Sequence, residues 1–195
     1  MKGYPVFPTD IWEEENSLVD NKKLTEVILE KEETEPSVLY TNVGGWHSMD
    51  NCAGQLEFQE VVDHVGETFK IIYQQNNYRE GVTYTITNLW ANVNRYRDFN
   101  KFHFHPNSDW SFSYYVKVPP NSGDIVFVDP KIRRLMRSHT EFCNNLNNPS
   151  QQSEFRIFPT DGKLVIFPAW LEHYVEPNGS QEARISISGN ISLDM

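Results

Sequence analysis

The sequence predicts a mainly β domain of the jelly-roll or sandwich type, with helices in its N-terminal part. From residue 82 onward, short runs of alternating, β-branched and aromatic residues are separated by turn sequences such as 119–123 and 177–179. Before residue 80, apolar residues instead recur at three- and four-residue steps, which is the period of a helix. Aromatic residues make up 13% of the chain, so large rings are available to fill a β-rich core.

Two helices are predicted in the N-terminal part. Asp20 and Asn21 can cap a short helix, and the acidic stretch 30–35 after it is expected to be a solvated loop that ends at Pro36. A longer helix is predicted where apolar residues share one face, namely Phe58, Val61, Val62, Val65, Phe69 and Ile72. The first of these helices buries Leu24, Val27 and Ile28 by the same argument.

Strands are expected throughout the remainder of the chain, at 82–86, 89–93, 112–118, 124–128, 155–158, 163–167 and 184–191. The polar segment 132–148 has weak helical character and is expected to be an insertion. Many short strands joined by turns favour a jelly roll. We expect one domain over residues 1–195, with 1–80 as a helical support segment and 82–195 as the β core.

Charge and cysteine content narrow the possible functions and settings. A formal net charge of −10 disfavours nucleic acid as a partner. No apolar run is long enough to span a membrane, and the N-terminus lacks the apolar region of a signal peptide. Cys52 and Cys143 form no CxxC pair and are too few for a disulfide framework, so we expect a cytoplasmic protein.

Three histidines are candidate metal ligands. His103 and His105 are two residues apart, so both imidazoles project to the same side of an extended chain. His173 follows the predicted strand 163–167, which a barrel can bring beside the first pair. Imidazole suits iron, zinc, copper and nickel alike, and histidines at this spacing are also common on surfaces. His47, His64 and His139 have no such partner and are expected to be ordinary structural or surface residues.

A buried anion site is predicted on the last strand. In the run 184–188, Arg184 and Ser186 face one side while Ile185 and Ile187 face the other. A guanidinium beside a hydroxyl suits a bound carboxylate. With 27 acidic residues in the chain, an internal salt bridge is the alternative.

Taken together, several segments resemble one family, the 2-oxoglutarate- and iron-dependent oxygenases. The resemblance rests on the runs His103-Phe104-His105-Pro106-Asn107-Ser108, Ser113-Tyr114-Tyr115-Val116, 127–130, 162–173, 177–178 and Arg184-Ile185-Ser186-Ile187-Ser188. The upstream runs 44–48 and 90–92 are similar as well, so the resemblance covers most of the chain.

This resemblance implies a double-stranded β-helix, a cupin-like jelly roll, with Fe(II) and 2-oxoglutarate at its open end. It implies that His103 and His173 are the two histidine ligands, and that Arg184, supported by Ser186, binds the distal carboxylate of 2-oxoglutarate. Tyr115 matches a tyrosine that contacts this cosubstrate in related prolyl hydroxylases, although a ring in the core is an equally good interpretation.

The third ligand departs from the wider superfamily, in which a carboxylate lies two residues after the first histidine. His105 occupies that position here, and three histidines also form common zinc sites. The nearest carboxylate, Asp109, is about 13 Å from His105 on a straight strand and could serve only if 106–107 folds the chain back. We predict His105 as the third metal ligand.

The expected function is therefore a dioxygenase that uses 2-oxoglutarate and dioxygen to hydroxylate a substrate. Prolyl or other amino-acid residues, nucleobases and small metabolites all stay open as substrates, and the sequence does not predict the oligomeric state. Two alternatives remain: a cupin-like metalloenzyme with three histidines that does not use 2-oxoglutarate, and a non-catalytic jelly-roll binding module. The binding module does not require His103 and His173 to meet, so their separation distinguishes it.

Overall fold

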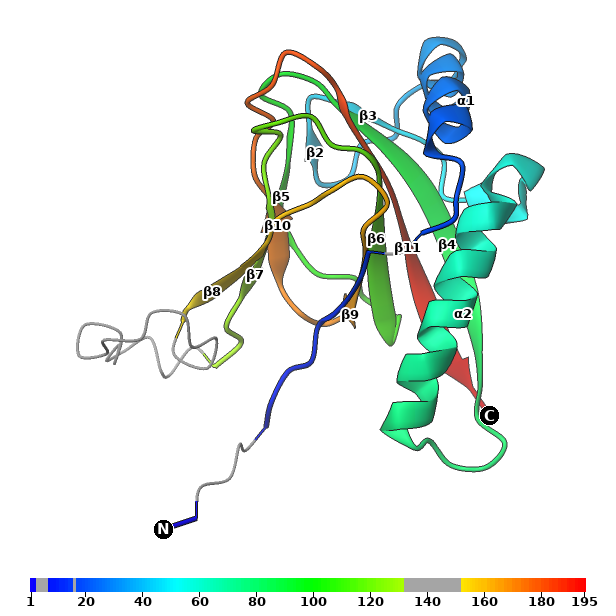
Figure 1. Cartoon of the computed structure of the whole chain (residues 1–195), viewed down its shortest axis with the longest axis vertical. Coiled ribbons are helices and arrows are strands. Elements are labelled where there is room, and N and C mark those ends of the chain that lie inside the picture. The colour runs from blue at the N-terminus through cyan, green and yellow to red at the C-terminus, as the bar shows by residue number, and fades with distance from the viewer. Residues whose placement is uncertain (3–6, 16, 132–151) are drawn as a thin grey trace.

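The protein is a sandwich of two antiparallel sheets with two helices on one outer face (Figure 1). The computed structural model describes residues 1–2, 7–15, 17–131 and 152–195. One sheet has six strands in the order β1-β9-β6-β11-β4-β3, and the other has five in the order β2-β5-β10-β7-β8. The predicted class, mainly β with N-terminal helices in a jelly roll, is confirmed.

After residue 82, each strand expected from the sequence is found with similar bounds, whereas β5 and β10 were not expected. The six-stranded sheet consists of β1 (Trp12–Glu14), β9 (Leu164–Pro168), β6 (Trp110–Lys117), β11 (Arg184–Asp194), β4 (Thr83–Asn94) and β3 (Trp46–His47). The five-stranded sheet consists of β2 (Asn42–Val43), β5 (Phe99–His103), β10 (His173–Val175), β7 (Ile125–Val128) and β8 (Glu154–Ile157). The predicted strands 82–86 and 89–93 form the single long strand β4.

The N-terminal part contributes strands as well as helices. Strand β1 pairs with β9, while β2 and β3 each lie at an edge of a sheet, and none of the three was predicted. Lys163 is nearly buried and forms ion pairs with Glu13 and Glu15, which holds β1 against the sheet. The division of the chain into a support segment and a β core stays a prediction.

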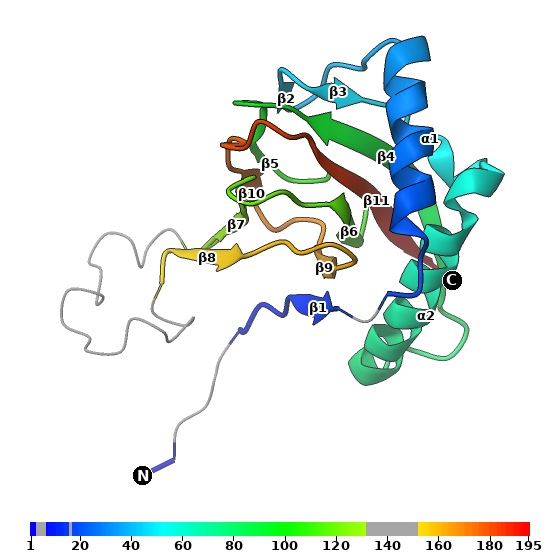
Figure 2. The same cartoon turned by 45° about the horizontal axis from the view of Figure 1, so that its top comes forward.

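The helices cover the outer face of the six-stranded sheet (Figure 2). They are α1 (Asn21–Thr34) and α2 (Gln59–Asn76), and two single 3-10 turns, η1 (Cys52–Gly54) and η2 (Leu56–Phe58), precede α2. Their apolar stripes pack on the outward residues of the sheet in one buried cluster, which includes Ile28, Phe69, Ala91, Val93, Ile185 and Ile187. The inner face of the sheet is thereby left to line the space between the two sheets.

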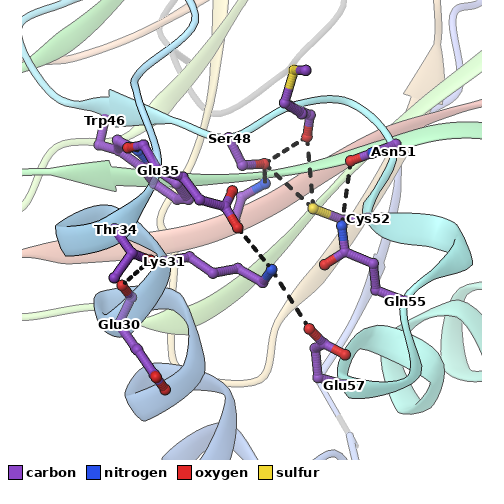
Figure 3. Close-up of polar contacts among 12 residues, drawn as sticks. Glu30, Lys31, Thr34, Glu35, Trp46, Ser48, Asn51, Cys52, Gln55 and Glu57 are labelled. Atoms are coloured by element: carbon purple, nitrogen blue, oxygen red, sulfur yellow. Dashed lines mark hydrogen bonds and ion pairs between the residues drawn. The ribbon is translucent and has the colours of Figure 1, made fainter.

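The end of α1 corrects one expectation. Asp20 caps the helix as predicted, because its carboxylate accepts a hydrogen bond from the N–H of Lys23. The loop expected over 30–35 is wrong: α1 continues to Thr34. Lys31 lies between the carboxylates of Glu35 and Glu57, at 3.1 and 3.5 Å, and so offsets the acidic charge of this stretch (Figure 3).

A polar network connects α1 to β4 and fixes the segment that contains His47 (Figure 3). The indole N–H of Trp46 donates to the carbonyl of Glu35, and the Ser48 hydroxyl accepts from the N–H of Ala91. His47 consequently pairs with Asn92 on β4 and is only 4% exposed.

Within the described ranges, no helix is long and apolar enough to cross a membrane. The predicted insertion 132–148, with His139 and Cys143, lies outside those ranges.

Candidate metal centre

The three predicted histidines meet at one end of the five-stranded sheet. His103 ends β5 and His173 begins β10, and the two residues are direct partners in the antiparallel pairing of these strands. His105 follows β5, where its backbone N–H donates to the carbonyl of Ala169. One ring nitrogen of each histidine lies within 4.8 Å of the others. Hydrogen bonding between strands that are distant in sequence has therefore assembled a possible metal site.

The hydrogen bonds of the three rings select one tautomer. The Nδ1 atoms of His103 and His173 lie 2.6 and 2.9 Å from the carbonyl oxygens of Lys101 and Leu171. A carbonyl can only accept, so each Nδ1 carries the hydrogen and each Nε2 has a free lone pair. In His105 the partner of Nδ1 is instead the side-chain Oδ1 of Asn190, at 2.6 Å.

Burial keeps the three imidazoles neutral. It lowers the pKa of His105 from 6.5 to about 4, with a further contribution from the neighbouring His103. Burial also lowers the pKa of His103, and it places the pKa of His173 well below the ordinary value. Neutral imidazoles with free lone pairs are the form that binds a divalent metal.

Asp109 does not join this group. The chain does turn after His105, where Asn107 has a φ of 63°. However, the Asp109 carboxylate accepts a hydrogen bond from the N–H of Leu193 at 2.8 Å. No carboxylate belongs to the histidine group within the residues that the structure describes.

Arg184 lies in the same cavity, with one part of its guanidinium free. The residue is 1% exposed, and its Nη1 donates to the backbone carbonyls of Ser122, Gly123 and Glu176. Its Nη2 is buried and has no hydrogen-bond partner within the described residues. An internal salt bridge, the alternative considered from the sequence, is not found for Arg184 among these residues. A buried N–H without an acceptor costs free energy, so this atom fits an anionic ligand.

Tyr115 and Ser186 line the same cavity as Arg184. Ser186 pairs directly with Tyr115 across β6 and β11, and both residues line the cavity. Burial raises the pKa of the Tyr115 hydroxyl well above its ordinary value, so it remains a hydrogen-bond donor. The ring of Tyr115 also packs in the smaller apolar cluster between the sheets, which agrees with its interpretation as a core ring, while its contact with the cosubstrate stays a prediction.

The cavity that contains these groups has a volume of about 350 Å³ and opens between the two sheets. Most of its polar lining is uncharged, including Asn88, Asn92, Asn94, Ser113, Ser188 and Asn190. Among its described lining residues, Arg184 and Asp50 have formal charges. The cavity thus contains three neutral candidate metal ligands, the histidines, and one cationic group, the guanidinium of Arg184, whose Nη2 has no partner among the described residues.

Sequence reasoning missed two contributors to this site. His47 was expected to be ordinary, yet it lines the cavity, and its ring stacks on Trp90 at 5.5 Å between centroids. Trp90 in turn stacks on His105 at 5.7 Å. Asn190 was also overlooked, although the alternation of Arg184, Ser186 and Ser188 along β11 places it on the same face.

Comparison with known proteins identifies the family. The family model described as "Putative 2OG-Fe(II) oxygenase" matches residues 88–190, which is more than half of the chain. The chain belongs to this oxygenase family. The matched region extends from β4 to β11 and includes the three histidines and Arg184. A comparison with curated proteins found no match.

Solved structures of this oxygenase type have the same fold. A prolyl-4-hydroxylase from Pseudomonas putida is similar at 14% identity and a TM-score of 0.61, with 94% of this chain and 92% of that chain covered. A Trichoplax adhaerens prolyl hydroxylase in complex with a hypoxia inducible factor peptide fragment is similar at 12% identity and a TM-score of 0.62, covering 93% and 83%. The viral collagen prolyl hydroxylase of Paramecium Bursaria Chlorella virus-1, solved with 2-oxoglutarate, is similar at 10% identity and a TM-score of 0.57, covering 93% and 94%.

Family membership decides between the functions that the sequence left open. As a 2-oxoglutarate- and Fe(II)-dependent oxygenase, the protein uses 2-oxoglutarate and dioxygen together with a substrate. A non-catalytic binding module would not require the rings of His103 and His173 to lie 4.3 Å apart. The three-histidine group and the unpaired Nη2 of Arg184 fit the metal and the dicarboxylate that the family uses.

Proposed function

We propose that this oxygenase hydroxylates its substrate at an iron held by the Nε2 atoms of His103, His105 and His173. The single observation that supports this ligand set most strongly is the shared tautomer. Each Nδ1 is already engaged with an oxygen acceptor, so each Nε2 is free to bind a metal. Iron with 2-oxoglutarate supplies the oxidising chemistry for C–H hydroxylation, and the protein supplies position and exclusion of water.

In this proposal Arg184 holds the cosubstrate. Its unpaired Nη2 donates to the distal carboxylate, and the hydroxyls of Tyr115 and Ser186 lie beside it as further donors. Because Nη1 is fixed by three backbone carbonyls, the guanidinium needs little reorganisation when the carboxylate binds. Residues 1–195 act as one domain in this proposal, since both sheets line the cavity.

An amino-acid residue of a protein, proline among them, is the substrate class we propose. The support comes from the fold: the prolyl hydroxylases named above are similar over more than nine-tenths of this chain. Two aromatic residues that line the cavity, Tyr40 and Phe104, are 65% and 51% exposed to solvent. The cavity is therefore open to a large substrate on this side.

The proposal is tested by anaerobic titration of the metal-free protein with Fe(II) and then 2-oxoglutarate. We expect a weak visible charge-transfer band that needs both additions, and 2-oxoglutarate turnover when oxygen is admitted. Metal binding with no spectral effect of 2-oxoglutarate would contradict the proposed arrangement of iron and cosubstrate in this cavity.

Substitution of Arg184 separates the two binding functions. In Arg184→Lys, a single ammonium cannot both hold the backbone carbonyls and present a second planar donor, so 2-oxoglutarate affinity should fall about tenfold or more. Fe(II) affinity measured without 2-oxoglutarate should change little. An equal loss of both affinities would show that Arg184 only supports the fold, and Ser186→Ala provides a milder variant if Arg184→Lys unfolds.

A further inference from the structure

The three histidines differ in what orients them. The acceptors for His103 and His173 are backbone carbonyls that lie two residues earlier in the chain, those of Lys101 and Leu171. No side-chain substitution removes such an acceptor. His105 depends on the side chain of Asn190, which lies on β11 in the opposite sheet. Only this ring of the three is therefore oriented by a replaceable group.

The oxygen of Asn190 is shared with a second donor. The Ser111 hydroxyl donates to the same Oδ1 at 2.7 Å, and Ser111 is fully buried, while Asn190 is 6% exposed. An amide oxygen has two lone pairs, so the two hydrogen bonds use its full accepting capacity. If the amide were reversed, its NH2 group would face Nδ1 of His105, and the ring hydrogen would have to move to Nε2. A ring in that state cannot bind a metal through Nε2.

The strand geometry fixes where the Asn190 side chain begins. Asn190 pairs with Ser111 on β6 and with Asn88 on β4. Immediately afterwards the pairing with β4 shifts, so that Thr87 is an extra residue on that strand. Before it, Gly189 lies so close to Phe112 that a Cβ atom would be 2.5 Å from the ring. These contacts hold the backbone of Asn190 from both sides.

We propose that Asn190 is the positioning residue for the third metal ligand, and that with Ser111 it holds His105 with its hydrogen on Nδ1 and its lone pair on Nε2. This role rests on the proposed ligand set. Asn190 adds no negative charge to a site that has no carboxylate among the described residues, and the role given to it and to Ser111 is to orient a ligand and not to bind the metal.

The test uses the full-length protein without metal and the variant Asn190→Leu, which keeps the branched shape but has no acceptor. Long-range 15N–1H NMR of the histidine rings reports which nitrogen carries the hydrogen. We expect His105 to change from one tautomer to a mixture, while His103 and His173 keep theirs. The Zn(II) affinity, measured by competition with a chromophoric chelator, should fall about 10- to 100-fold, as is typical when such a partner is lost.

Two further variants make the result specific. Asn190→Asp retains the acceptor, so the His105 tautomer and the Zn(II) affinity should both stay as in the parent protein. Asn178→Leu removes another buried asparagine, whose amide bonds the backbone of Asn94, Glu182 and Ser180, and controls for general destabilisation. It should lower stability and leave the His105 tautomer unchanged.

The results for these variants either support or overturn the proposed role of Asn190. The inference is overturned if Asn190→Leu keeps a single Nδ1–H tautomer with unchanged Zn(II) affinity, or if Asn190→Asp behaves like Asn190→Leu. Because the tautomer is measured without iron, 2-oxoglutarate or turnover, such a failure leaves the hydroxylase proposal standing. The converse result is the expected change of the His105 tautomer in Asn190→Leu together with no turnover of 2-oxoglutarate by the parent protein. That combination would overturn the proposed function and leave the role of Asn190 standing.

Discussion

At the scale of single residues, the metal-binding groups that the described residues supply to the centre are all neutral. Imidazoles supply lone pairs without charge, so the two positive charges of a bound Fe(II) would be balanced by its cosubstrate and not by the protein. We therefore expect the metal to bind more tightly in the presence of 2-oxoglutarate than alone. Isothermal titration of Fe(II) or Zn(II) with and without 2-oxoglutarate measures this coupling, and equal affinities would contradict it.

The lowered pKa values of the histidines predict how stability depends on pH. His105 has a pKa of about 4 when folded and 6.5 otherwise, so below pH 6.5 the unfolded chain binds a proton that the folded one does not. The free energy of unfolding of the metal-free protein should be highest above pH 6.5 and fall as the pH approaches 4. Urea unfolding at several pH values tests this. His105→Gln should show a shallower decline, whereas parallel curves for the two proteins would contradict the assignment.

The three histidines and Arg184 could be proposed from the sequence because the pattern that indicates each of them lies within one strand or at its end. His103 and His105 share a face at a spacing of two, and Arg184 begins a strand whose alternation is clear. The role of Asn190 was not visible in this way. Its partner His105 is far away in the sequence, and an asparagine on a strand is not by itself a sign of a metal site.

At the scale of secondary structure elements, strand alternation explains why the β core was predicted well. In β11, Ile185 and Ile187 pack under the helices, while Arg184 and Ser186 face the cavity. The short strands β1 to β3 and β10 were not predicted because two or three residues cannot show a period, and β5 was not predicted because its sequence does not alternate between apolar and polar residues. The end of α1 was misjudged because two acidic residues of this stretch have cationic partners: Glu35 pairs with Lys31, and Glu32 pairs with Arg95, which is distant in the sequence.

Gly189 on β11 provides a prediction at this scale. In Gly189→Ala, the new Cβ would meet the ring of Phe112 and the carbonyl of Asn88 at 2.5 and 2.6 Å. We expect a loss of about 1–3 kcal/mol in the free energy of unfolding, since overpacked cores lose that much. Zn(II) affinity should fall as well, because the adjacent Asn190 must move.

The matched control is Gly66→Ala in α2, where a Cβ would meet nothing within 4 Å. Alanine is the better helix former, so this variant should gain about 0.5–1 kcal/mol in urea unfolding and keep its Zn(II) affinity. If Gly189→Ala were as stable as the parent protein, the close packing of β11 against β6 would not constrain Asn190.

At the scale of the whole molecule, the six-stranded sheet has two faces of opposite character. Its outer face forms a continuous apolar cluster with α1 and α2, whereas the inner face at β4 and β11 is lined with amides and hydroxyls. The larger of the two buried apolar clusters thus lies on the helical side, and the smaller one lies between the sheets. Asn92 and Asn94 are 6% and 3% exposed, and both residues line the cavity. Their amides are therefore placed to form hydrogen bonds with a bound ligand.

The contrast between the apolar outer face and the polar inner face of the sheet predicts that a substitution on the inner face can increase stability while it weakens ligand binding. In Asn92→Leu, a polar group of the cavity wall is replaced by an apolar group, and polar residues of binding sites commonly reduce stability, so the free energy of unfolding of the ligand-free protein should rise by about 1 kcal/mol. The affinity for 2-oxoglutarate, or substrate-dependent turnover, should fall, since Asn92 lies directly opposite Ser186 in the cavity wall. The same change at Asn178, whose amide is fully hydrogen-bonded, should instead lose about 1–3 kcal/mol. Urea unfolding and ligand titration of both variants measure the contrast. If Asn92→Leu lost as much stability as Asn178→Leu, the amide of Asn92 would stabilise the fold. The polar residues of the inner face would then be explained by structure and not by ligand binding.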